Sequence, residues 1–337
     1  MSEIAVTQRG TGAPGDYRAI TPAEWAAPDA RRRLQLALGA LWLLDAILQY
    51  QPVMFSRAFG QMLAAAAAGN PDLVSRPIIW DARLVGQHPV VLNAAFATIQ
   101  LLLALGIAWR PTVKAALGAS VVWSLGVWWF GEGLGGVLTG TASPVSGAPG
   151  AAVLYALLAV LLWPRERGAA GGASAAPAPF IAARAVGAPA ARAVWLILWA
   201  SLAYFALLPA NRAPQAVHDM LSSLTSGEPS WLAAIGQHGA ALVAHQGLAA
   251  SVVLAGLLAL IAAGGYLPPP AARLALAVAM VVATAIWVAG QALGGILAGG
   301  GTDPDTGPLL VLLVLAFWPA RGPMRRERSA GGPRGGQ

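Results

Sequence analysis

Long apolar segments alternate with short polar or proline-bounded segments along most of the chain. A run of about 20 apolar residues is long enough to cross the hydrocarbon core of a bilayer as a helix. The pattern predicts transmembrane helices at 34–51, 88–109, 113–138, 151–163, 193–208, 244–263, 271–293 and 308–318. The predicted fold class is therefore all-α, a polytopic membrane protein with eight transmembrane helices.

Two longer segments, 53–88 and 209–243, interrupt this pattern. In the first, Phe55, Phe59, Met62 and Leu63 recur at helical spacing. Apolar residues on one face of an otherwise polar helix are typical of a helix that lies in the membrane interface. We expect both segments to face the outer side of the membrane.

A glycine-rich segment occurs twice, as GEGLGGVLTG at 131–140 and GQALGGILAG at 290–299. Further pairs at nearly the same separation are Gly69 and Gly227, Pro71 and Pro229, Pro111 and Pro269, Trp128 and Trp287, and Trp163-Pro164 and Trp318-Pro319. Each half then holds four helices, so the copies have the same orientation and form a parallel repeat. The predicted organisation is a disordered cytoplasmic arm (1–33), a first repeat (34–164), an Ala/Gly/Pro linker (165–192), a second repeat (193–319) and a basic tail (320–337).

The glycines at 131, 135, 136 and 140 stand four residues apart in pairs. Small residues at this spacing let two helix backbones approach closely, so we interpret them as a helix-packing face. Gly131, Gly133 and Gly136 also match G-x-G-x-x-G, but that dinucleotide motif needs a preceding strand and a soluble βαβ unit. The nucleotide interpretation is therefore rejected.

Composition agrees with a membrane protein and narrows its chemistry. The chain is 57% hydrophobic and 10% charged, whereas soluble domains carry roughly 25% charged residues. The absence of cysteine excludes disulfides and thiolate metal sites within this chain. The net charge of +7 comes from basic residues in the termini and loops, which argues against nucleic-acid binding by the embedded body. Their placement predicts a plasma-membrane protein with both termini in the cytoplasm.

Polar residues in three predicted helices fall at one depth near the outer surface. Asp45 and Glu132 each lie six residues from the outer end of their predicted helix, and Asn93 lies five residues into its own. An ionisable group at membrane depth is costly and should face a cavity or the bundle interior. We predict an outward-opening pocket in the first repeat. The candidate ligand-binding residues are Asp45, Gln49, Arg83, His88, Asn93, Trp128 and Glu132.

The second repeat has uncharged residues at the aligned positions. The pairs are Asp45 with Leu202 or Ala203, His88 with Gln246, Asn93 with Ser251, and Glu132 with Gln291. The hypothesis is that the first repeat holds the site and that the second is a scaffold. The alternative is that Asp45 and Glu132 pair with Arg57, Arg83 or backbone donors and only orient helices.

No metal site and no cofactor is predicted. His238 and His245 are seven residues apart and would share one helical face, with His218 and Met220 nearby in sequence. A zinc site needs at least a third ligand, and no motif supplies one. Interfacial histidines with water or backbone partners are the favoured interpretation.

The order of one helix, a long outer segment and three more helices resembles the DoxX-like four-helix membrane proteins. Some members of that group are quinone-linked oxidoreductase subunits. The phrases Leu44-Asp45-Ala46, Gln51-Pro52-Val53-Met54-Phe55 and 131–136 more closely resemble a family of uncharacterised bacterial integral membrane proteins. Neither resemblance implies a role for a particular residue.

Three functions stay open at this point. The favoured one is a non-enzymatic protein, permease-like or ligand-binding, that uses the Asp45 and Glu132 pocket. The second is a quinone-linked oxidoreductase subunit, and the third is a scaffold or assembly protein without a site. The expected partners are the lipid bilayer, a small molecule, ion or quinone, and a membrane protein.

Overall fold

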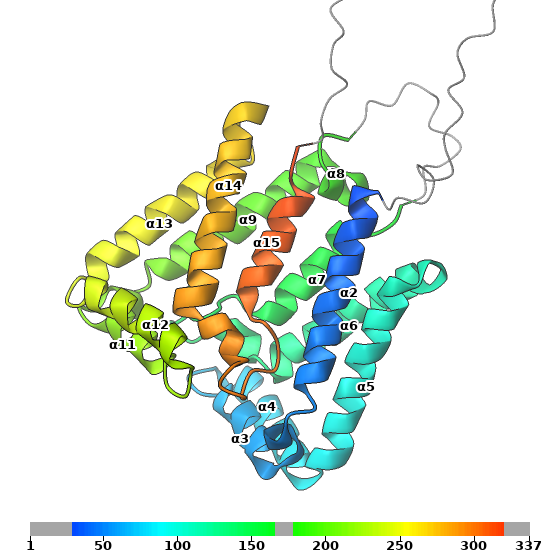
Figure 1. The fold of residues 1–337 in the computed structure, drawn as a ribbon, viewed down its shortest axis with the longest axis vertical. Coiled ribbons are helices and arrows are strands. Elements are labelled where there is room, and N and C mark those ends of the chain that lie inside the picture. Colours follow the sequence, from blue (N-terminus) through cyan, green and yellow to red (C-terminus); the bar gives the residue numbers. More distant parts are fainter. Residues whose placement is uncertain (1–28, 166–177, 320–337) are drawn as a thin grey trace, which may run out of the picture.

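The computed structural model describes residues 29–165 and 178–319, and helices account for nearly all of its regular structure (Figure 1). Five helical segments are long and apolar enough to cross a membrane. They are α5 (Pro89–Ala108), Arg110–Phe130 with α6 (Val113–Phe130), α9 (Ala188–Ala206), α13 (Gly247–Gly264), and Pro269–Gly290 with α14 (Pro269–Ala285). By length and composition, the described part of the chain is that of an all-α, multi-pass membrane protein.

Three further helices run beside these five. The first, α2 (Ala30–Leu48), starts with three arginines, and Asp29 caps it by accepting a hydrogen bond from Arg32 N at 2.7 Å. The other two, α7 (Ala151–Leu161) and α15 (Thr306–Ala316), are apolar but only 11 residues long. Each is about 16 Å long at 1.5 Å per residue, roughly half of the hydrocarbon thickness. The segments that lead to the N-termini of α7 and α15 are therefore non-helical and lie within the protein.

Short helices cover one end of the bundle (Figure 1). From the first half these are η1 (Pro52–Phe55), α3 (Arg57–Ala65) and α4 (Asp72–Gln87); from the second half they are α10 (Pro209–Arg212), α11 (Ala216–Ser223) and α12 (Ser230–Val243). The segment 53–88 thus contains three helices, and α3 and α4, which are separated by residues 66–71, pack on each other. In α3, Phe59 is buried while Met62 is exposed.

The segment expected to be a linker is shorter than predicted. Residues 181–186 form α8 (Ile181–Val186), which packs against α7 and α9 and buries Ala182, Ala183 and Ala185. The helix α9 already begins at Ala188. The arm at 1–28, the residues at 166–177 and the tail at 320–337 lie outside the described residues.

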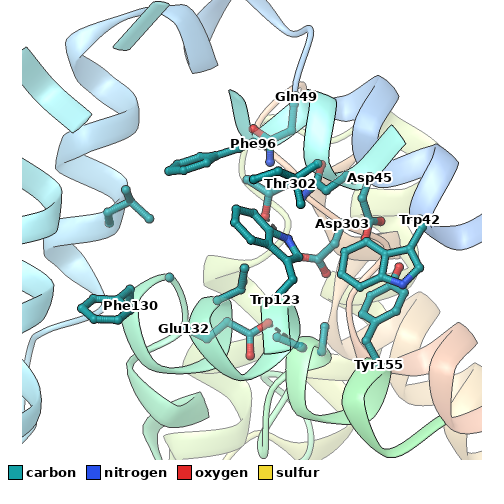
Figure 2. Close-up of a pocket in the computed structure, with 18 of the residues that line it drawn as sticks. Trp42, Asp45, Gln49, Phe96, Trp123, Phe130, Glu132, Tyr155, Thr302 and Asp303 are labelled. Carbon is teal, nitrogen blue, oxygen red and sulfur yellow. Dashed lines mark hydrogen bonds between the residues drawn. The ribbon is translucent and has the colours of Figure 1, made fainter. Parts of the chain in front are cut away.

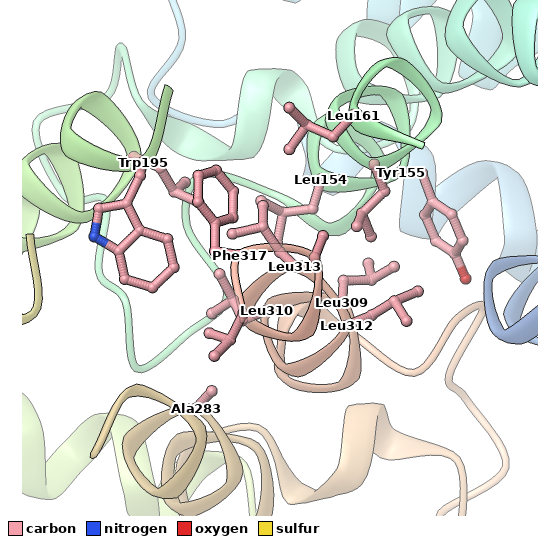
Figure 3. Packing of buried hydrophobic residues seen from close by; sticks show 14 of the residues in the cluster. Leu154, Tyr155, Leu161, Trp195, Ala283, Leu309, Leu310, Leu312, Leu313 and Phe317 are labelled. Carbon is pink, nitrogen blue, oxygen red and sulfur yellow. The ribbon is translucent and has the colours of Figure 1, made fainter. Parts of the chain in front are cut away.

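The two halves share one hydrophobic core. Helix α15 of the second half packs against α7 and α2 of the first half. Figure 3 shows Leu309, Leu312 and Leu313 of α15 beside Leu154 of α7, and all four are at most 5% exposed. Because the short helices are enclosed by protein, their leucines stabilise the contact between the halves by excluding both lipid and water.

The two glycine-rich segments are turns, which corrects the prediction that helices continue to residues 138 and 293. Helix α6 ends at Phe130, and the residues 133–136 of η3 (Gly133–Gly136) all have positive φ. In the second half a π-helical turn (Ile286–Gly290) is followed by η5 (Ala292–Gly295), where φ is again positive at every residue. Left-handed backbone costs a non-glycine residue about 1–2 kcal/mol. The glycines therefore serve these turns, and the helix-packing interpretation was wrong.

Candidate ligand-binding pocket

A cavity of about 710 Å³ lies between α2, α3, α5, α6 and α7 (Figure 2). Its size is within the range of small-molecule sites. Most of its lining is apolar, with aromatic rings from five helices. The polar lining residues are Asp45, Gln49, Asp81, Gln100, Trp123, Glu132, Tyr155, Thr302 and Asp303.

Asp45 lies on α2 and is only 2% exposed. Its Oδ1 atom has no hydrogen-bond partner among the described residues. Figure 2 shows Asp45 beside Trp42 and Tyr155, and these two rings pack with centroids 4.2 Å apart. Trp42 is fixed from its other side, because its Nε1 donates to Ser120 Oγ at 3.0 Å. The carboxylate is thus held beside aromatic rings, where the Tyr155 side chain interacts with it, and no arginine, lysine or histidine is among the residues that line the cavity.

Glu132 is directed at the start of α7 by the glycine turn. The first backbone N–H groups of a helix have no partner within the helix, and a carboxylate is a favourable cap. Ala152 N donates to Glu132 Oε1 at 2.9 Å. The second oxygen, Oε2, has no partner among the described residues. One oxygen therefore closes a helix terminus, and the other is left for the cavity that Glu132 lines.

Gln291 occupies the corresponding place in the second half, and both polar atoms of its side chain form hydrogen bonds within the protein. Its Oε1 accepts from Gly307 N at 3.3 Å, and its Nε2 donates to Thr306 Oγ1 at 2.6 Å and weakly to Pro144 O at 3.5 Å. A side chain added at the neighbouring Gly290 would meet Val145 of the first half. The loop 141–148 therefore packs against this turn, whereas the turn at Glu132 borders the cavity.

The cavity is completed from the second half, in contrast to the prediction of a pocket formed by the first half alone. Thr302 and Asp303 line it from the loop that precedes α15. This loop is tied to the first half, because Gln51 Nε2 donates to Gly301 O at 2.7 Å. Asp303 Oδ1 in turn accepts from Asp305 N at 2.7 Å, and Asp303 Oδ2 from Thr302 Oγ1 at 3.0 Å. Asp303 thus adds negative charge, while its oxygens are engaged within the loop.

The predicted site residues divide into three groups. Asp45, Gln49 and Glu132 line the cavity. Asn93 is buried behind it, where Nδ2 donates to the backbone oxygen of Gln49 at 2.7 Å and holds the end of α2. Trp128 supports the turn by donating from Nε1 to Pro149 O at 2.7 Å.

Arg83 and His88 are exposed, on α4 and at its end, and are not among the lining residues. Within the described residues, neither forms an ion pair with the pocket carboxylates. From α4, it is Asp81 that lines the cavity.

Several lining residues were not singled out from the sequence. Tyr155 lies in an apolar helix without a distinguishing motif, and Trp123 is one of a run of tryptophans. Asp303 had a usable signal, since the acidic pair Asp303 and Asp305 directly precedes a short apolar helix in a half that is otherwise poor in acids. The aligned loop of the first half contains no acid, so aligning the two halves gives no indication that Asp303 belongs to the site.

Burial changes the acidity of the loop carboxyls. It raises the pKa of Asp303, and the same burial together with the neighbouring Asp303 raises the pKa of Asp305 to about 7. Asp305 also caps α15 by accepting from Thr306 N at 2.5 Å. Burial likewise raises the pKa of Asp81 on the surface helix α4. Acidic groups at this end of the bundle therefore favour the protonated form more than exposed carboxyls do.

The histidines do not share the helical face expected of them. His238 lies on α12, whereas His245 follows that helix in a left-handed turn and contacts Gln215. His218 Nδ1 lies 3.0 Å from Asp219 Oδ1 on the surface. In the described ranges, no three His, Cys, Asp or Glu side chains gather as a metal site would require.

Comparison with known proteins leaves the chain without a family: no family model, no curated protein and no solved structure matches it. The resemblance to DoxX-like proteins consequently has no support beyond the layout of the sequence.

Proposed function

We propose that this chain is a plasma-membrane protein that binds a small molecule in the cavity bordered by Asp45 and Glu132. The observation that carries the proposal is the pair of unpartnered carboxylate oxygens at the wall of a large, mostly apolar cavity. A buried acceptor without a donor costs about 1–3 kcal/mol or more, which a ligand with donors would recover. The alternative interpretation, pairing with arginines or backbone donors, accounts for Glu132 Oε1, which accepts from Ala152 N, but not for the two unpartnered oxygens, and no arginine lines the cavity.

The orientation that we propose places the pocket toward the outside. The start of α2, the turn between α5 and α6, and the ends of α8 and α15 lie at the opposite end of the bundle from α3 and α4 (Figure 1). Arg32 contacts the carbonyls of Ile107 and Ala108 there, so two basic segments meet at this end. The positive-inside rule assigns it to the cytoplasm, together with both termini.

The proposal includes eight spans and a duplicated architecture. Both glycine turns have the same left-handed backbone, and both aim an acidic or amide side chain at the start of an 11-residue helix. Two unrelated segments would rarely adopt such similar geometry. In this account, α2, α7 and α15 complete the five long spans to eight, in two four-helix repeats at 34–164 and 193–319.

Binding is better supported than transport. On the cytoplasmic side of the cavity, Leu38, Leu154 and Leu158 are fully buried and close the bundle. A permease would need this cluster to separate, and the chain has few polar side chains with which to line the resulting path. The pocket therefore supports a ligand-binding function first.

A quinone-binding function has one observation in its favour. The cavity has aromatic walls, and lining residues such as Val122, 74% exposed, lie on the lipid-facing side of the bundle. A hydrophobic ligand could enter from the bilayer by this route. A quinone, however, offers only acceptors, and the unpartnered atoms of the wall are mainly acceptors as well.

Background-free thiol labelling tests the proposal, because the chain contains no cysteine. Gly126 lines the cavity, Gly256 is an exposed residue of α13 that does not line it, and an added Cβ at either meets no atom within 4 Å. We expect a small membrane-impermeant thiol reagent, added to intact cells, to label Gly126→Cys well above Gly256→Cys. Equal labelling of the two variants in both intact cells and inside-out vesicles would refute a water-reachable pocket. Labelling of Gly126→Cys only in inside-out vesicles would reverse the orientation and keep the pocket.

A further inference from the structure

The unpartnered atoms around the cavity are mostly of one kind. Asp45 Oδ1, Gln49 Oε1, Gln100 Oε1 and Glu132 Oε2 are buried acceptors without a hydrogen-bond partner among the described residues. The side chains of Asp45, Gln49 and Gln100 are at least nine-tenths buried. Trp123 Nε1 is an unpartnered donor in the same wall, the side-chain amide groups of Gln49 and Gln100 can also donate, and the Tyr155 hydroxyl can act as either. A ligand that satisfies this wall must bring several donors.

The charge of the wall has one sign. Carboxylates reach the cavity from α2 (Asp45), α4 (Asp81), the turn after α6 (Glu132) and the loop before α15 (Asp303). Among the described residues that line it, none is an arginine, lysine or histidine. Burying a carboxylate without a countercharge is costly, so a group of them favours either bound protons or a bound cation.

The remaining lining suits the body of an amphipathic molecule. Phe59 packs edge-on against Phe96 with ring centroids 6.2 Å apart, and Phe96 packs against Trp123 at 5.5 Å. Trp42 and Tyr155 form a second aromatic pair beside Asp45 (Figure 2). Aromatic faces attract ammonium groups by about 0.5–2 kcal/mol and also bury apolar surface. Both effects act on the same ligand if it carries a positive head and an apolar body.

Resting on the ligand-binding function above, we propose that the pocket takes an amphipathic organic cation, a protonated amine whose N–H groups bond Asp45 and Glu132 while its apolar body lies among the aromatic rings. Where a carboxyl of the empty pocket holds a proton, the ammonium group replaces it and the proton passes to water. The ionisable groups that face the ligand are the carboxyls of Asp45, Asp81, Glu132 and Asp303 and the hydroxyl of Tyr155 on α7. Affinity for the amine consequently rises with pH until the amine itself loses its proton.

The test compares two probes of the same shape, 4-phenylbutylamine and 4-phenylbutan-1-ol, by calorimetric titration of the full chain in nanodiscs. We expect the amine to bind at least tenfold more tightly than the alcohol. Hydrogen bonds to a charged group contribute roughly 1.5–3 kcal/mol, so Glu132→Gln should weaken amine binding about 10- to 100-fold and leave alcohol binding nearly unchanged. Glu132→Gln should fold, because Gln291 occupies the same kind of turn. Asp45→Asn provides the second variant.

Asp219→Asn is the matched control, because it removes the same charge from an exposed position on α11. It should bind the amine as the unsubstituted chain does, and Gly126→Trp, which fills the cavity, should abolish binding. If the alcohol or a short-chain quinone binds as well as the amine and Glu132→Gln changes nothing, the cation proposal fails while the pocket stands. If no probe binds, or if binding is insensitive to Gly126→Trp, the proposed function fails as well.

Discussion

Replacing Gly135 by alanine should lower the stability of the protein markedly. Gly135 has φ +61°, and an added Cβ would collide with the backbone carbonyl of Pro149. That carbonyl also accepts the hydrogen bond from Trp128 Nε1 at 2.7 Å. The substitution therefore strains the turn that directs Glu132 and displaces the segment that leads into α7.

The magnitude follows from two contributions. A left-handed conformation costs an alanine about 1–2 kcal/mol relative to glycine. Moving the Pro149 carbonyl weakens a hydrogen bond whose net contribution is about 0.5–1.5 kcal/mol. Together they predict a loss of roughly 1.5–3.5 kcal/mol. Gly294→Ala should behave similarly, because Gly294 has φ +78° and its added Cβ would meet the carbonyl of Asp303.

The assay is unfolding of the purified protein by a rising fraction of denaturing detergent, followed by tryptophan fluorescence. Gly126→Ala is the control, since this helical glycine has open space around it; alanine should stabilise the helix by about 0.5–1 kcal/mol. If Gly135→Ala were as stable as Gly126→Ala, the left-handed turn and its contact with Pro149 would be wrong.

Two further predictions concern the second half. Gln291→Glu should lower the free energy of unfolding by about 1–3 kcal/mol, because it puts a carboxylate into a closed site beside the Pro144 carbonyl. The loss should be larger at pH 8 than at pH 5.5. The same substitution at the exposed Gln87 should cost little, and equal losses in the two variants would contradict a closed site. The folded-state pKa of Asp305 is about 7, above the ordinary value of 3.8 for an aspartate. The contribution of Asp305 to stability is therefore fully present below pH 4 and is lost as the pH rises through 7. The total loss is on the order of 4 kcal/mol. Asp305→Asn should reduce the slope of stability against pH from 5 to 8, whereas the exposed Asp72→Asn should retain it; an unchanged slope in Asp305→Asn would refute the assignment.

The sequence predicted the long helices well, because each depends on a local property, a continuous apolar run bounded by proline or polar residues. It misjudged the glycine segments, since spacing alone does not distinguish a helix-packing face from a left-handed turn. The distinction depends on Pro149 and Ala66, whose carbonyls approach Gly135 and Gly133 from elsewhere in the chain. Such contacts are tertiary and leave no periodic signal.

The candidate site was predictable in part for the same reason. Asp45 and Glu132 were identifiable as ionisable residues in or beside apolar segments, which are rare and therefore conspicuous. Asp303 reaches the cavity only because the loop before α15 crosses to the first half and is held there by Gln51. Arg83 is close to the site in sequence but exposed on α4, so nearness along the chain was misleading for it.

The most direct test of a ligand-binding pocket is protection of a thiol within it. The rate at which an impermeant thiol reagent labels Gly126→Cys would be measured with and without 4-phenylbutylamine, and compared with Gly256→Cys under the same conditions. The account predicts that the amine slows labelling at position 126 in a saturable manner, that it leaves position 256 unaffected, and that Glu132→Gln removes the protection. Labelling at 126 that is fast and indifferent to the amine, the alcohol and a quinone alike would contradict the claim that this cavity binds a small molecule.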